Sequence, residues 1–131
     1  MNETIALVDP MPSMLILMRN CLIRDGYREI GTFYNANEFL DAACNGYNPS
    51  LVISEYLLPD MKGNHMLEMA KKYNPGLRAI LATMQPVTAI NNSTHVPVVE
   101  KGSGDFHVRL LDMINRELKG VNTEVAHAAV F

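Results

Sequence analysis

The sequence predicts an α/β domain in which helices cover both faces of a five-stranded parallel sheet. Short apolar runs alternate with longer segments of helical periodicity, which is typical of parallel strands joined by crossover helices. Residues 4–8 (TIALV) and 51–54 (LVIS) are apolar at successive positions, as expected for strands buried on both faces. Turn-forming pairs such as Asn45-Gly46 separate the segments. We therefore expect right-handed crossovers between neighbouring strands.

Composition and charge narrow the class of protein. A chain of 131 residues with 48% apolar and 19% charged residues fits one globular domain with a buried core. The net charge is −3 and no run of Lys or Arg occurs, which argues against nucleic-acid partners and anionic membrane surfaces. No apolar stretch reaches the roughly 18 residues of a membrane span, and no secretion signal is visible. We expect a cytoplasmic location.

In the first half of the chain, two helices separate three strands. Pro12 suits the first turn of a helix and places one after strand 4–8. Residues 30–34 form the second expected strand, and Asn35 caps the helix that follows it. The third strand is 51–54.

In the second half, Asn64 caps a third helix that runs to about Tyr73. Residues 77–83 and 96–100 are the remaining strands, and a last helix spans 105–119.

The interval 84–95 has the weakest helical signal. The alternation of elements places a fourth helix here, yet the interval contains Pro86, several β-branched residues and two Asn. We expect this helix to be short or irregular.

Four polar side chains stand where the predicted strands end. Asp9 follows the first strand, Glu55 the third and Lys101 the fifth, and Thr83 ends the fourth. In open α/β sheets, ligands bind beyond the carboxyl ends of the strands. We therefore expect two acids, a hydroxyl and a cation to converge at one edge of the sheet.

The order of these residues, together with the segment 51–63 (LVISEYLLPDMKG), resembles a receiver domain of two-component response regulators. The resemblance extends from about Ile5 to Leu118. Its most specific part is Pro59 and Gly63, at the family's spacing after the third strand.

The resemblance implies a flavodoxin-like fold for a receiver-like domain at residues 1–119, followed by a C-terminal tail at 120–131. It also implies a role in bacterial signal transduction through protein partners. It implies neither binding to nucleic acid or membrane nor a conventional enzyme activity.

The resemblance also implies a role for each residue at the strand ends. In the family, two adjacent acids after the first strand and an aspartate after the third hold Mg²⁺, and that aspartate accepts a phosphoryl group. Asp9 matches one acid of the pair, but Pro10 stands at the other position, and Glu55 replaces the acceptor. Thr83 and Lys101 match the hydroxyl and the lysine that read the phosphate.

These departures predict that phosphorylation is lost. Mg²⁺ demands near-octahedral oxygen ligation, and Pro10 removes one carboxylate ligand. Glu55 moves its carboxylate one methylene outward, which displaces the geometry that phosphoryl transfer needs. We expect weak or absent Mg²⁺ binding and no other cofactor.

The longer side chain of Glu55 partly imitates a phosphorylated aspartate. A charge-assisted hydrogen bond to Lys101 would then lock the domain in one signalling state. The competing interpretation is a degraded site without mimicry.

The sequence therefore predicts an atypical, stand-alone receiver that acts as a phosphorylation-independent protein-interaction module and not as an enzyme. The alternative is a phosphoaccepting receiver with an unusual acceptor residue. A flavin or nucleotide binder is disfavoured, because residues 9–12 (DPMP) supply no phosphate cradle.

The first helix and the fifth strand supply candidate partner surfaces. Leu15, Ile16 and Ile23 lie off the expected buried stripe of the helix, where polar residues are usual. Val98 stands where the family often has an aromatic switch residue. The predicted buried stripe contains Met14, Leu17, Met18, Cys21 and Leu22.

The predicted tail is unusually apolar at its end, where residues 128–131 read AAVF. Two interpretations stay open. The tail packs on its own domain, or it contacts a partner or a second copy in a homodimer.

Overall fold

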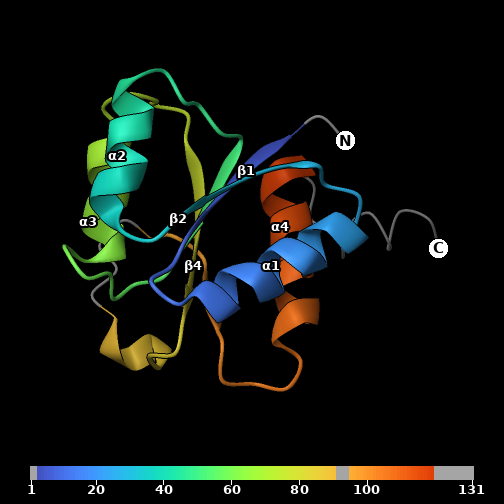
Figure 1. The fold of residues 1–131 in the computed structure, drawn as a ribbon. Coiled ribbons are helices and arrows are strands. Elements are labelled where there is room, and N and C mark those ends of the chain that lie inside the picture. Colours follow the sequence, from blue (N-terminus) through green and yellow to red (C-terminus); the bar gives the residue numbers. More distant parts are fainter. Residues whose placement is uncertain (1–2, 91–94, 120–131) are drawn as a thin grey trace.

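A computed structural model describes residues 3–90 and 95–119, and its five strands form one parallel sheet in the order β2-β1-β3-β4-β5 (Figure 1). This order confirms the flavodoxin-like topology. The strands are β1 (Thr4–Val8), β2 (Glu29–Phe33), β3 (Leu51–Ser54), β4 (Arg78–Thr83) and β5 (Val98–Glu100). The helices are α1 (Pro12–Arg24), α2 (Ala36–Cys44), α3 (Gly63–Ala70) and α4 (Phe106–Lys119), with a 3-10 helix, η1, at Val87–Ala89.

The helices form two layers, with α1 and α4 on one face of the sheet and α2 and α3 on the other (Figure 1). Consecutive residues of β1 serve opposite layers. Ile5 and Leu7 belong to the core beneath α1 and α4, and Ala6 and Val8 to the core beneath α2 and α3. The uninterrupted apolar run of β1 follows from this double burial. No helix in the described part of the chain is long and apolar enough to cross a bilayer.

The strand predictions agree closely with the structure. β1 and β3 have the predicted bounds, β2 begins and ends one residue earlier than predicted, and β4 begins one residue later than predicted. β5 is shorter than predicted because Pro97 has no N–H to donate to a neighbour, although its carbonyl still accepts a bond from the Leu81 amide at 2.8 Å. Where a short or irregular helix was expected, η1 has three residues. Residues 91–94 lie outside the described chain.

The prediction for α3 needs a correction at both ends. Lys62, not Asn64, occupies the N-cap, and Asn64 lies within the helix. The Gly63 amide donates to the Tyr56 carbonyl at 2.6 Å, so the turn after β3 fixes where α3 begins. The helix ends at Ala70, before the predicted Tyr73.

The predicted stripe of α1 was also partly wrong. Leu15 is only 4% exposed and packs with Met18 and Leu22 in the core, so it is not a surface residue. Leu17, which was predicted to be buried, is 47% exposed, and Cys21 is half-buried. Apolar residues cover so much of this helix that three-and-four spacing alone did not identify the side that faces the sheet.

The last helix, α4, has the predicted apolar side and a defined end. Phe106, Leu110 and Ile114 are buried against the sheet. The Arg78 guanidinium at the start of β4 donates to the Leu118 carbonyl at 3.1 Å, which satisfies a C-terminal acceptor of the helix. The predicted tail, 120–131, lies outside the described residues.

Gly63 permits a close approach between α3 and the end of β3. A Cβ atom at this position would lie 2.3 Å from the backbone carbonyl oxygen of Glu55. Because that oxygen belongs to the backbone, a rotamer change cannot relieve the overlap. Glycine here therefore keeps α3 against the segment that carries Glu55.

We predict that Gly63→Ala destabilises the fold by about 1–3 kcal/mol, because α3 or the Glu55 segment must shift. Helix propensity alone would instead favour alanine by roughly 1 kcal/mol. Gly104→Ala is the control, since no atom lies within 4 Å of its added Cβ. Urea unfolding measures both variants, and a Gly63→Ala protein as stable as the control would contradict the steric argument.

Candidate functional site

The four polar residues predicted at the strand ends lie together at the carboxyl edge of the sheet. Asp9 directly follows β1, Glu55 follows β3 and Lys101 follows β5, and Thr83 is the last residue of β4. All four are buried. The Lys101 amide donates to the Thr83 carbonyl at 2.8 Å, which continues the ladder between β4 and β5 into the site.

The Lys101 ammonium lies between the two carboxylates. Its Nζ donates to Glu55 Oε1 at 2.9 Å and also to Asp9 Oδ2. The Asp9 and Lys101 side chains are each 1% exposed, and that of Glu55 is 10% exposed. One cation therefore faces two carboxylates almost out of contact with water, where an electrostatic interaction is much stronger than at the surface.

Backbone amides satisfy the remaining carboxylate oxygens. The Met11 amide donates to Asp9 Oδ1 at 2.9 Å. The amides of Tyr56 and Leu57 donate to Glu55 Oε2, the second at 3.2 Å. Thr83 forms a further hydrogen bond to the Glu55 side chain. Each carboxylate is consequently bound through both of its oxygens, as buried charges require.

Two opposing effects set the pKa of Glu55. Burial, the largest single effect, raises the pKa, but hydrogen bonds from Thr83 and Lys101, the charge of Lys101 and the Leu57 amide together lower it. The net result is a pKa below the ordinary value, so Glu55 is ionised in the folded protein at neutral pH.

The residues present do not fit a Mg²⁺ ion. Asp9 and Glu55 already bind the Lys101 ammonium and backbone amides, and Pro10 offers no side-chain ligand. In the described ranges no cluster of three His, Cys, Asp or Glu residues could hold a metal. A divalent cation would have to displace the ammonium from the carboxylates that it neutralises.

Asp60 is a structural residue of the site region that the sequence did not reveal. Its carboxylate accepts from the amides of Ala36 at 3.0 Å and Asn37 at 2.8 Å, while Asn35 caps α2 through the Glu38 amide at 2.8 Å. Together the two side chains satisfy the first turn of α2. Asp60 lies in the loop after Glu55, so its hydrogen bonds connect this loop to the start of α2. A local pattern finds the Asn35 cap, but an acceptor 24 residues from Ala36 has no local signal.

Asp60 is also ionised in the fold. Burial is the largest single effect and raises the pKa, but the bonds from the α2 amides and from the amides of its own turn together lower the pKa below the ordinary value.

The candidate partner residues lie in different environments. Ile16 and Ile23 are 60% and 44% exposed on α1. Leu15 is in the core, as corrected above. Val98 is half-buried and packs against the core beneath α2 and α3.

We predict that Lys101→Met destabilises the domain by about 3–5 kcal/mol, because it leaves two buried carboxylates without their cation. Methionine keeps most of the packing of the lysine stem, so the loss reports on the charge. Arg116→Met is the control, since its pair with Asp112 at 2.9 Å is 44% exposed on each side and is worth about 0.2–1 kcal/mol. A similar small loss in both variants, measured by urea unfolding, would disprove the buried interaction.

Glu55 should also make stability dependent on pH. A carboxylate whose folded pKa is depressed stabilises the fold above its unfolded pKa, and this stabilisation is lost as the pH falls through the folded pKa. We expect the free energy of unfolding to fall as the pH drops below the ordinary Glu value of 4.5. The slope should be smaller for Glu55→Gln, measured against Glu68→Gln, which removes an exposed carboxylate of α3. Equal slopes in the two variants would contradict the assignment.

Comparisons with known proteins agree with this fold. The family model of the response regulator receiver domain matches residues 5–106. A CheY-like receiver domain protein from Methanospirillum hungatei JF-1 is 26% identical with a TM-score of 0.78, over 93% of this chain and 98% of that one. TrrA of Thermotoga maritima, solved in complex with Mg(2+)-BeF, is 25% identical with a TM-score of 0.77, over 88% and 99%.

A third structure shows the same fold at lower identity. The receiver domain of an HD domain-containing protein from Pseudomonas fluorescens Pf-5 is 24% identical with a TM-score of 0.77, over 92% of this chain and 97% of that one. The curated proteins give no match. The chain therefore belongs to the response regulator receiver domain family, the signalling modules of two-component systems.

Proposed function

We propose that this receiver is a phosphorylation-independent protein-interaction module, in which Glu55 replaces the acceptor aspartate and Lys101 holds the domain in one signalling state. The observation that carries the proposal is the buried Lys101 ammonium between the carboxylates of Asp9 and Glu55. A phosphoryl group and its metal would have to enter the space that this cation occupies.

The hydrogen bonds of Glu55 argue against phosphoryl transfer to this residue. Its Oε1 binds Lys101 and its Oε2 binds the amides of Tyr56 and Leu57. Attack by either oxygen would first break contacts made in a nearly dry site. Pro10 offers no carboxylate to replace the lost ligation, and phosphoryl transfer depends on positioned charge.

The same contacts explain how one state would be maintained. Thr83 bonds to Glu55 and accepts from the Gln85 amide at 3.1 Å. The Val87 amide donates to Glu100 Oε1 at 3.1 Å. The chain after β4 is thereby attached both to the site and to β5, without a phosphate. A protein partner would meet a surface whose shape does not depend on modification.

The alternative is a receiver that accepts phosphate on an unusual residue. TrrA of Thermotoga maritima was solved with Mg(2+)-BeF, so receivers of similar fold do bind such groups. The two functions differ in one measurable property, which is whether the chain takes up a phosphoryl group.

Intact-mass measurement after incubation with Mg²⁺ and acetyl phosphate should show no adduct on the wild-type protein. The double variant Pro10→Asp/Glu55→Asp is the positive control, because it restores the second acid and the shorter acceptor, and we expect it to gain one phosphoryl group. Glu55→Asp alone separates the contribution of the acceptor from that of the metal ligand. A single phosphoryl adduct on the wild-type protein would overturn the proposal in favour of the alternative.

A further inference from the structure

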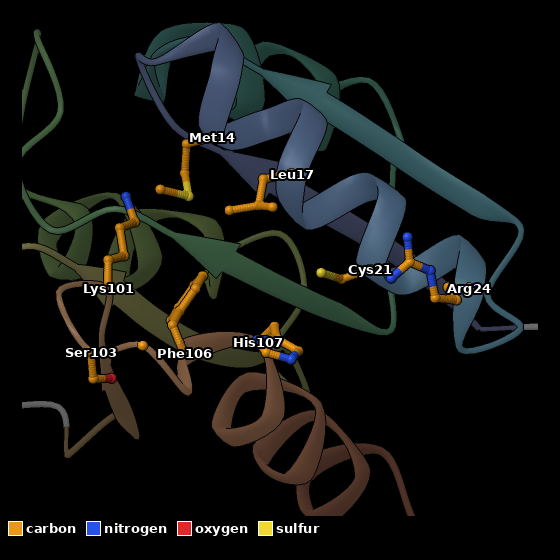
Figure 2. A pocket seen from close by; sticks show the side chains of 9 residues that line it. Met14, Leu17, Cys21, Arg24, Lys101, Ser103, Phe106 and His107 are labelled. Atoms are coloured by element: carbon orange, nitrogen blue, oxygen red, sulfur yellow. The ribbon is translucent and has the colours of Figure 1, made fainter.

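A groove of about 360 Å³ separates α1 from α4 near the carboxyl edge of the sheet. Figure 2 shows Met14, Leu17 and Cys21 directed from α1 toward the space above Phe106 and His107. Much of this lining is apolar. A smaller hollow shares Cys21 and His107 and extends to Leu111, so the depression follows the seam between the two helices.

Met14, Leu17 and Cys21 recur at three-and-four spacing along α1, which is typical of a buried helix face. Leu17 is nevertheless 47% exposed, although it lies one turn from Met14 and Cys21 on the same side. At the rim, Arg24 forms no ion pair with any residue of 3–90 or 95–119. The groove thus has an apolar wall that the described residues leave partly exposed. It also has a cation, Arg24, that no carboxylate of those residues pairs with.

We propose that residues 121–131 of this chain bind in this groove. Their sequence, VNTEVAHAAVF, is mostly apolar and contains one acid, Glu124. Apolar side chains match the wall formed by Met14 and Leu17, and Glu124 matches the cation of Arg24. Lys101 also lines the groove, but the proposal does not rest on the proposed function, because it is carried by the apolar wall and by Arg24.

The end of α4 brings this segment within reach of the groove. The groove residue His107 lies twelve residues before Lys119 (119 − 107), so it is about 18 Å back along the helix axis. The eleven residues 121–131 span up to roughly 36 Å when extended. Gly120 can adopt the left-handed conformation that reverses a chain after a helix.

Attachment to α4 favours the segment of the same molecule over other occupants. A short tether holds a ligand at an effective concentration on the order of millimolar, so even a weak apolar contact is occupied. Residues 121–131 would then cover Leu17, and a partner helix that binds between α1 and α4 would have to displace them.

Cysteine reactivity tests the proposal in the full-length chain. Cys21 lines the groove, and Cys44 is an exposed thiol at the end of α2 on the opposite face of the sheet, which makes it an internal reference. N-ethylmaleimide is added, and the two rates are measured by peptide mass. The test variant Val125→Asp/Phe131→Asp should free the groove. If the segment occupies the groove for about 90% of the time, Cys21 should react roughly tenfold faster in this variant.

A matched control adds the same charge at polar positions. Asn122→Asp/Thr123→Asp should leave the rate of Cys21 at the wild-type value. Leu17→Gln changes the groove instead of the segment and adds no charge beside the thiol, so it should raise Cys21 reactivity as the test variant does. The rate of Cys44 should stay constant throughout. Equal rates at Cys21 in the wild-type protein and the test variant would overturn the proposal. Protection of Cys21 that disappears on dilution, with a dimer in light scattering, would assign the groove to a second copy instead.

Discussion

The buried ammonium of Lys101 is the interaction on which the rest of the site depends. It joins the segments that follow three strands, because it reaches Asp9 after β1 and Glu55 after β3 from its own position after β5. Without it, two carboxylates would face each other in a nearly dry environment, which folded proteins avoid by pairing or protonation. The arrangement therefore stabilises the fold and also determines which chemistry the site can perform. The proposed loss of phosphorylation rests on the same arrangement, because this lysine neutralises both acids.

The loop after Glu55 transmits the geometry of the site to the helices. At one end, the amides of Tyr56 and Leu57 bind the Glu55 carboxylate. Further along, Asp60 caps α2, and Gly63 allows α3 to approach the Glu55 backbone. Two helices on one face of the sheet are thus positioned by a loop of a few residues. This loop therefore connects the site directly to α2 and α3.

The sequence predicted the parts of this structure that have local signals. Continuous apolar runs gave β1 and β3, and side chains at the strand ends gave the site, because parallel strands share one edge. The orientation of α1 was predicted less well, since both Leu15 and Leu17 belong to plausible apolar stripes and only tertiary packing distinguishes them. The Asp60 cap of α2 could not be predicted, because its partners are distant in sequence.

The two edges of the sheet differ in what they offer another chain. β5 has three residues, and Pro97 directly before it has no N–H. A short edge strand next to a proline offers few backbone groups for strand addition, which protects a sheet from pairing with other chains. β2, on the opposite edge, is longer at five residues. A protein that recognises the β5 side of this domain must therefore do so through side chains, so its specificity depends on surface residues that can change without loss of the fold.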